Sequence, residues 1–262
     1  MELAYIVSGL SVGLLVGLTG VGGGSLMTPL LVFLFGFAPN TAVGTDLLFA
    51  AITKTGGVAV HHGNHRSVDW KIVGHLSMGS LPAALAVIFC LEYFDIPKST
   101  ISSVITYALG IALILTALAL FLRNRLMKAS LETDSHNPGR FAHWQMPATV
   151  LIGLLLGCLV TLSSIGAGAL GTVALFYLYP RLPTVRIVGT DLAHAIPLTA
   201  VAGLGHLHMG NVDLALLGSL LIGSLPGIWV GSHLSARIPE YVLRPALASV
   251  LMLIGLKFVW VT

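Results

Sequence analysis

Ten runs of apolar residues follow one another along the chain, and short polar segments separate them. The runs cover residues 3–19, 26–37, 42–60, 72–91, 99–122, 147–162, 169–179, 187–204, 214–234 and 242–261. A helix needs roughly 20 apolar residues to cross a bilayer core about 30 Å thick. Eight runs therefore predict membrane-spanning helices. The second and seventh runs are undersized, and the sequence leaves open whether they cross fully or re-enter.

Composition agrees with this pattern. Of the 262 residues, 56% are hydrophobic and 9% are charged, and the mean hydropathy is +0.94. An average soluble domain carries roughly 25% charged residues, so this chain lacks the polar side chains that a water-facing surface needs. The sequence predicts an all-α polytopic membrane protein. It excludes soluble enzymes, and we expect no nucleic-acid partner.

The two halves of the chain repeat one another at an offset of 144 or 145 residues (166 − 22 and 189 − 44). The matched blocks are Gly22-Gly23-Gly24 with Gly166-Ala167-Gly168, Gly44-Thr45-Asp46-Leu47 with Gly189-Thr190-Asp191-Leu192, His61 with His206, and Val68-Asp69 with Val212-Asp213. We predict a membrane repeat over residues 1–122, a polar cytoplasmic linker over 123–146 and a second repeat over 147–262. Each repeat has five segments. Because this number is odd, the second repeat starts on the opposite side of the membrane from the first and has the inverted orientation. Such inverted repeats, with Gly-broken short helices meeting near the midplane, are typical of secondary transporters.

Positive charge gives an independent test of this count. Ten of the 13 lysines and arginines lie in or beside the odd-numbered loops between the segments. Because cytoplasmic loops are enriched in Lys and Arg, we expect the odd loops to be cytoplasmic and both termini to lie outside.

Two glycine-rich breaks, one before each undersized run, are the strongest candidates for a substrate site. They contribute the candidate residues Gly22, Gly23, Gly24 and Ser25, and Ser163, Ser164, Gly166 and Gly168. A helix that starts after such a break points unpaired N–H groups and a positive dipole end into the gap, which suits an anion. Thr45 and Thr190 are further candidate donors. The alternative is close helix packing through small residues.

Few ionisable residues lie inside the apolar runs, and such residues are costly there and usually functional. The candidates for coupling or gating are Asp46, Lys54, His61, Asp191, His194 and His206. In the alignment of the repeats, Lys54 matches Thr199 and His194 matches Phe49. The aspartates could instead cap helices, Lys54 could extend to the membrane interface, and His194 could be a buried neutral imidazole. We predict no metal site, because no carboxylate or thiol completes a ligand set around the histidines.

The order of these motifs resembles the TauE/SafE family of sulfite-exporter-like permeases across essentially the whole chain. The resemblance rests on Gly20-Val21-Gly22-Gly23-Gly24 followed by Pro29, on Val43-Gly44-Thr45-Asp46-Leu47, on His61 and Val68-Asp69, and on their second-half counterparts. It implies a carrier of the bacterial inner membrane, in which the termini that the charge pattern places outside would be periplasmic. In the second half, Gly166-Ala167-Gly168-Ala169 stands where the family often has a second full glycine string.

The residues and the resemblance together predict a secondary transporter that exports sulfite, a small organosulfonate or another sulfur oxyanion by alternating access. Its partners would be the oxyanion and the lipid bilayer, with a homodimer and coupling to protons or another ion left open. We predict no enzyme activity and no cofactor. The alternatives are an anion channel and an intramembrane serine hydrolase that uses Ser163 or Ser164 with His194 or His206.

Overall fold

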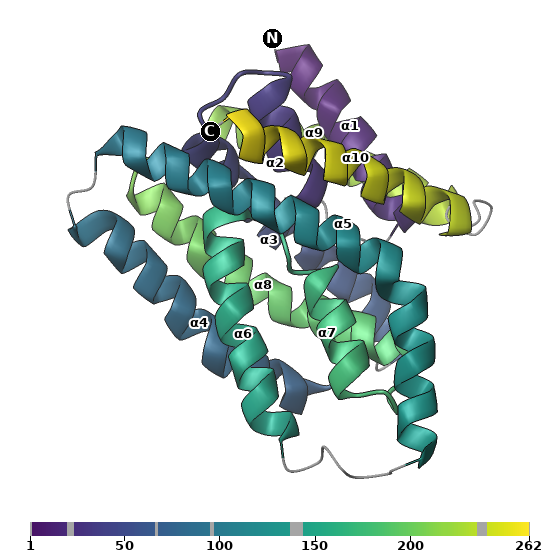
Figure 1. Cartoon of the computed structure of the whole chain (residues 1–262). Helices are drawn as coiled ribbons and strands as arrows, with labels where there is room; N and C mark the ends of the chain where they lie inside the picture. The colour runs from purple at the N-terminus through teal and green to yellow at the C-terminus, as the bar shows by residue number, and fades with distance from the viewer. Residues whose placement is uncertain are drawn as a thin grey trace.

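The computed structural model describes residues 2–19, 24–65, 68–94, 97–136, 144–234 and 240–261. Within these ranges the chain forms helices joined by short turns and no strand, so the predicted all-α class is confirmed. The helices are α1 (Glu2–Thr19), α2 (Gly24–Phe33), α3 (Pro39–His65), α4 (Trp70–Tyr93), α5 (Lys98–His136), α6 (Gln145–Ser163), α7 (Leu170–Leu178), α8 (Thr184–His208), α9 (Leu214–Leu234) and α10 (Glu240–Val261). Figure 1 shows their arrangement.

Helices α2 and α7 are too short to cross a membrane. They contain 10 and 9 residues, and at a rise of 1.5 Å per residue each spans roughly half of a 30 Å bilayer core. Five of the described helices, α4, α5, α6, α8 and α9, are long and apolar enough to span by length and composition alone. Many of their large apolar side chains, such as Phe89 and Leu155, are exposed on the outside of the protein. Lipid is the environment that suits such a surface.

One boundary differs from the prediction. The apolar run that begins at residue 99 ends at 122, but α5 continues as a helix to His136. The polar extension is rich in Arg, Leu, Lys and Glu, which are good helix formers even without an apolar face. The first part of the predicted linker is therefore helical.

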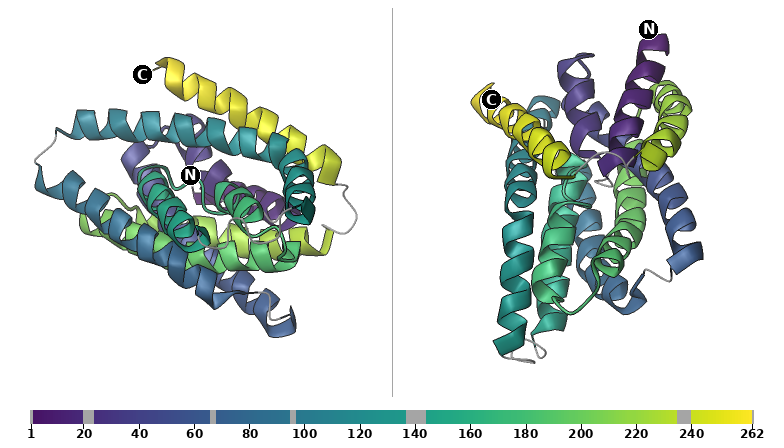
Figure 2. Two further views of the ribbon diagram at one scale, coloured as in Figure 1. Left: turned by 60° about the horizontal axis from the view of Figure 1, so that its bottom comes forward. Right: turned by 90° about the vertical axis from the view of Figure 1, so that its right-hand side faces the viewer.

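The two repeats pack against one another in a crossed pattern. The first helix of each repeat packs against the fourth helix of the other, giving the pairs α1–α9 and α4–α6, while α3 packs on α8 and α5 on α10. The yellow helix α10 lies along α5 in Figure 1 and again in the left view of Figure 2. Because every main pair joins the two repeats, neither repeat buries its apolar surface alone.

Glycines permit the close approach of the crossed pairs. A side chain at Gly79 of α4 would collide with the backbone of Val150 in α6, and one at Gly223 of α9 would collide with the backbone of Ile6 in α1. These contacts are repeat equivalents, since 79 + 144 is 223 and 6 + 144 is 150. Small residues at such interfaces let helix backbones meet in the absence of a strong hydrophobic driving force.

Helices α3 and α8 run antiparallel. Gly44, near the start of α3, packs against His206 and Asn211 at the end of α8, while Asp69, just after α3, bonds to Thr190 near the start of α8. Because α3 and α8 are equivalent helices of the two repeats, this antiparallel crossing is the arrangement expected of inverted repeats. The two ends of the chain also lie toward the same end of the molecule (Figures 1 and 2).

Candidate substrate and coupling site

Each short helix is tied to a long helix by the same threonine–aspartate contact. Thr28 Oγ1 of α2 donates a hydrogen bond to Asp46 Oδ2 of α3 at 2.5 Å. Thr172 Oγ1 of α7 donates to Asp191 Oδ2 of α8 at 2.9 Å. Both carboxylates are buried, a placement that proteins tolerate only where hydrogen bonds or opposite charges compensate. We call Thr28 with Asp46 the first half-site and Thr172 with Asp191 the second half-site.

Both carboxylates lie at the N-terminal ends of the short helices. Asp191 interacts with the backbone N–H groups of Gly168 and Thr172, and Asp46 interacts with the N–H of Thr28. The first N–H groups of a helix lack intrahelical partners and carry the positive end of its dipole, so they stabilise negative charge. The N-terminus of α7, one of the places where the sequence predicts an anion, is therefore occupied by the carboxylate of Asp191.

Lys54 of α3 lies between the two half-sites. Its side chain is buried, and Nζ donates to the carbonyl oxygen of Ala167 in the second glycine-rich break at 3.4 Å. It interacts electrostatically with Asp191 and with Asp46, so it does not extend to the membrane interface. Its repeat equivalent, Thr199, bonds only to carbonyls of its own helix. A single lysine of one repeat thus places its charge between a carboxylate from each repeat.

The second break runs from one half-site to the other. Ser164 contributes to the electrostatic surroundings of Asp46, the Ala167 carbonyl accepts from Lys54, and Gly168 lies beside Asp191. Ser164 has the left-handed φ of 59°, and Gly166 and Gly168 have φ of 122° and 123°. This conformation, which glycine adopts readily, turns the chain between α6 and α7 and carries it past the buried lysine.

The two break serines have different surroundings. Ser163 Oγ donates to the Leu159 carbonyl at 2.6 Å and accepts from the Ile165 N–H at 3.1 Å. Ser164 Oγ is buried and has no hydrogen-bond partner among the described residues. Neither hydroxyl is bonded to His194 or His206, so the structure does not bring together the nucleophile and base that a serine hydrolase requires.

The two candidate histidines of α8 are buried. His194 Nε2 lies 2.8 Å from Ser80 Oγ of α4, and His206 Nε2 lies 3.0 Å from the Thr161 carbonyl oxygen of α6. Both Nδ1 atoms lack a partner in the described part of the chain. Phe49, the repeat equivalent of His194, packs in an apolar cluster instead. The second repeat therefore has an imidazole at this position, and the first repeat has an apolar ring in its place.

Other candidates are placed only in part. Gly22 and Gly23 lie outside the described residues, as does the side chain of His61. Gly24 begins α2, and Ser25 is buried in its first turn. Whether these residues bind substrate stays a prediction. Among the described residues, no group of three or more His, Cys, Asp or Glu side chains is arranged to hold a metal ion.

Thr45 and Thr190 hold the crossed contacts between the repeats. Thr190 Oγ1 accepts a hydrogen bond from the backbone N–H of Asp69 at 2.9 Å, and Thr45 Oγ1 accepts from the N–H of Asp213 at 3.1 Å. Each threonine directly precedes a half-site aspartate. The start of α4 is thereby linked to the second half-site, and the start of α9 to the first.

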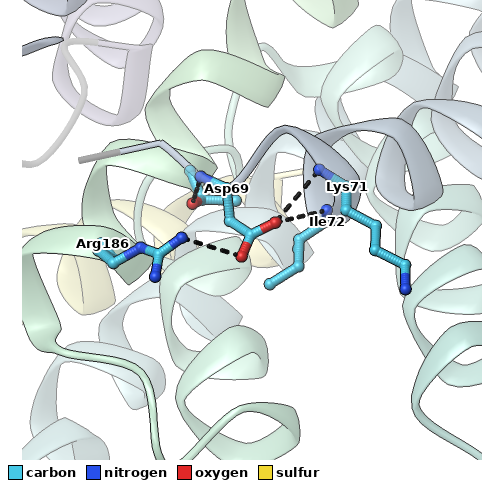
Figure 3. A network of polar contacts seen from close by, with 5 residues as sticks. Asp69, Lys71, Ile72 and Arg186 are labelled. Atoms are coloured by element: carbon cyan, nitrogen blue, oxygen red, sulfur yellow. Dashed lines mark hydrogen bonds and ion pairs between the residues drawn. The ribbon is translucent and has the colours of Figure 1, made fainter. Parts of the chain in front are cut away.

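Asp69 is the centre of a further polar network, which Figure 3 shows. Its carboxylate caps α4 by accepting from the N–H groups of Lys71 and Ile72 at 3.2 and 3.4 Å, and Arg186 Nη2 donates to it at 3.2 Å. The residues equivalent to Asp69 and Arg186 are Asp213 and Thr41. Close to them in the chain, Asn40 Nδ2 donates to Asn211 Oδ1 at 2.7 Å in a neutral contact.

Sequence reasoning missed Thr28, Thr172, Ser80 and Arg186 as site residues. The two threonines share the 144-residue offset of the repeat (172 − 28), which is a signal that could have found them. Ser80 has the same signal, because it recurs as Ser224 at the same offset (224 − 80). Arg186 has no such signal, and its partner Asp69 lies 117 residues away in the chain.

The fold and the comparisons with known proteins together define a multi-pass membrane transporter. The sequence matches the family described as Sulfite exporter TauE/SafE over residues 5–258. The chain belongs to that family.

Several relatives are described as probable membrane transporter proteins. YjnA of Bacillus subtilis (strain 168) is 41% identical over 99% of this chain and 100% of its own length. YdhB of the same organism is 28% identical over 92% of this chain and 96% of its own length. MJ0441 of Methanocaldococcus jannaschii is 26% identical over 96% and 92%. No solved structure matches this chain.

Proposed function

We propose that this protein is a secondary transporter that exports sulfite, a small organosulfonate or another small sulfur oxyanion across the inner membrane by alternating access. One observation carries the proposal. Two half-helices, one from each repeat, are each bonded near their starts to a buried carboxylate, and Lys54 lies between the two carboxylates. A site built in this way, from half-helix N-termini between inverted repeats, suits an anionic substrate near the midplane.

The substrate would bind between the two breaks. Backbone N–H groups, the hydroxyls of Ser25 and Ser164, and the ammonium group of Lys54 are donors that an oxyanion with several acceptor oxygens can use. The buried Ser164 hydroxyl without a partner favours this location, because buried polar groups in native proteins are nearly always satisfied.

Alternating access follows from the crossed packing. The pairs α1–α9 and α4–α6 each contain one helix from each repeat, so each can move as a unit relative to α3 and α8. With the odd loops cytoplasmic, the Asp69–Arg186 contact would close the cytoplasmic side and the Asn40–Asn211 contact the periplasmic side. Both termini would then be periplasmic.

Purified protein in liposomes tests the substrate. We expect exchange of radiolabelled sulfite for internal unlabelled sulfite, or the same exchange with methanesulfonate, above the level of protein-free liposomes. Ser25→Ala and Ser164→Ala should raise KM several-fold with little change in kcat, because a lost donor weakens binding. Ser103→Ala is the matched control, since the Ser103 hydroxyl bonds only to its own helix on the exposed surface.

Direction is tested in inside-out membrane vesicles, which should accumulate the labelled anion if the protein is an exporter. Absence of exchange with both probes in the wild-type protein would contradict the proposed substrate class. Accumulation only in right-side-out vesicles would contradict export.

A further inference from the structure

The two half-sites contain two carboxylates, and among the described residues Lys54 is the one cation between them. Asp46, Asp191 and Lys54 are all buried. With all three ionised the cluster would carry one uncompensated negative charge, and a buried uncompensated charge costs several kcal/mol. The described residues around α3 supply no second lysine or arginine to the cluster. One of the two carboxylates is therefore the natural place for a proton.

The contacts distinguish the two carboxylates. Asp191 interacts with two backbone N–H groups, those of Gly168 and Thr172, and Lys54 Nζ donates to the carbonyl oxygen of Ala167, which directly precedes Gly168. A backbone N–H can only donate, so these contacts favour an ionised carboxylate.

Asp191 is bonded to one hydroxyl group, that of Thr172, whereas Asp46 interacts with one backbone N–H group, that of Thr28, and faces two hydroxyl groups. Thr28 Oγ1 is bonded to Oδ2, and the unpartnered Ser164 hydroxyl lies on the same carboxylate. A hydroxyl donates to an ionised carboxylate but can also accept from a protonated one. Oδ1 of Asp46, like Oδ1 of Asp191, has no hydrogen-bond partner among the described residues, so it is available to carry the hydrogen.

Other titratable groups face this region from the neighbouring helices. Helix α8 contributes Asp191, His194 and His206, and the start of α9 contributes Asp213. Within the described residues, α2 and the second break contribute no titratable side chain. His194 Nε2 lies 2.8 Å from Ser80 Oγ, and His206 is bonded to a backbone carbonyl.

We infer that Asp46 carries one transferable proton during transport, while Lys54 holds Asp191 ionised, so that the symmetric aspartates have different roles. The inference rests on the proposed function. Protonation forms an O–H bond at Oδ1 of Asp46, and the neutral carboxyl then competes less for the N-terminus of α2, which becomes available to the substrate anion.

The proton and the substrate anion consequently bind to the same state of the protein, and both cross the membrane in the same direction. When the anion leaves, Asp46 loses its proton to water on that side and returns to the α2 N-terminus. A sulfite dianion with one proton carries one net negative charge, so the inside-negative membrane potential drives this pair outward, in agreement with export.

The test uses proteoliposomes with the membrane potential clamped at zero, with sulfite and methanesulfonate as probes. Methanesulfonate has no proton to transfer in this range, so its proton movement must come from the protein. Wild-type protein should accumulate the anion roughly tenfold for each pH unit of an acid-outside gradient, because 1.4 kcal/mol is a factor of ten. An entrapped pH-sensitive dye should report entry of the proton.

Asp46→Asn should exchange anion but no longer accumulate it, because the amide keeps an oxygen for Thr28 but cannot release a proton. Its affinity for the anion should rise, because the neutral side chain competes less for α2. Wild-type affinity should fall as the pH rises, whereas the affinity of Asp46→Asn should be independent of pH. Asp191→Asn, the matched control, should exchange more slowly but still accumulate with pH.

A charge swap sharpens the test. In the double variant Lys54→Thr/Thr199→Lys, the lysine moves to the equivalent position, and proton coupling should move from Asp46 to Asp191. Size-exclusion chromatography in detergent checks that this variant folds. If it does not, the single Asn variants still decide the question.

The outcomes separate the two proposals. If wild-type protein exchanges neither probe, the proposed function fails, and the inference fails with it. If exchange is present but Asp46→Asn accumulates like wild type, or Asp191→Asn or His194→Gln abolishes accumulation instead, the function stands and the assignment to Asp46 is overturned. Accumulation driven by a sodium gradient and not by pH would also overturn it.

Discussion

The two half-sites share their framework and differ in their charges. Each joins a short helix to a buried aspartate through a threonine. The first repeat, however, supplies Lys54 where the second has Thr199, and the second supplies His194 where the first has Phe49. The contacts that build the fold are thus repeated, whereas the ionisable groups between them are not. Duplication accounts for the scaffold, and later divergence of a few residues accounts for the chemistry.

Replacing the unmatched lysine should have the largest effect. Lys54→Thr copies the residue of the second repeat and leaves two buried carboxylates without a cation. A buried charge without compensation costs several kcal/mol, so we expect a large fall in the unfolding temperature in detergent and loss of anion exchange. Thr199→Val is the matched control and should change either quantity little. Full exchange by Lys54→Thr would show that the difference between the half-sites is irrelevant to transport.

The threonines of the half-sites should come next. Thr28→Val and Thr172→Val each remove a hydrogen bond to a buried carboxylate, which is worth about 1.5–3 kcal/mol. Similar losses of unfolding free energy, measured by denaturant titration in detergent, would support equal structural roles. A loss in only one of the variants would show that the framework itself is asymmetric.

The close glycine contacts of the pairs α4–α6 and α1–α9 test whether the two repeats are equivalent at positions away from the charged residues. Gly79→Ala and Gly223→Ala place a methyl group against the backbone of the partner helix, and overpacking of this kind costs about 1–3 kcal/mol. Their controls are Gly74→Ala and Gly218→Ala, which are also repeat equivalents and meet no atom within 4 Å. These controls should be neutral or slightly stabilising, because alanine is the better helix former. Equal destabilisation by all four would contradict the crossed interfaces.

The ion pair at the start of α4 should have the smallest effect on stability. The Arg186 and Asp69 side chains are 43% and 25% exposed, and exposed ion pairs contribute about 0–1 kcal/mol. Arg186→Gln should therefore lower the unfolding temperature only slightly, and less so at high salt. Asn40→Ala gives the comparison at the neutral contact between Asn40 and Asn211. A stability loss as large as that of Lys54→Thr would mean that the ion pair is part of the buried site.

Much of the fold was predictable because its signals are local. Apolar run length indicated ten segments with two short ones, and the matched blocks indicated two repeats with equivalent breaks. The helical extension of α5 to His136 was missed because its polar residues resemble a linker, although they are good helix formers.

The site was predictable in part. Asp46, Lys54 and Asp191 stand out in the sequence because charges inside apolar runs are rare. Their partners do not stand out. Threonine is common in membrane helices, and nothing near Thr45 in the chain indicates that its hydroxyl would accept the N–H of Asp213.

The sequence by itself determined the class of protein, its internal duplication and the residues able to carry charge through a membrane, because composition, periodicity and spacing are properties of the chain. Only the tertiary structure decided how they meet: that α3 and α8 cross antiparallel, that Lys54 of one repeat reaches Ala167 of the other, and that the carboxylate of Asp191 occupies the N-terminus of α7. Those contacts join residues up to 171 positions apart. They depend on helix packing and desolvation, which no local pattern encodes.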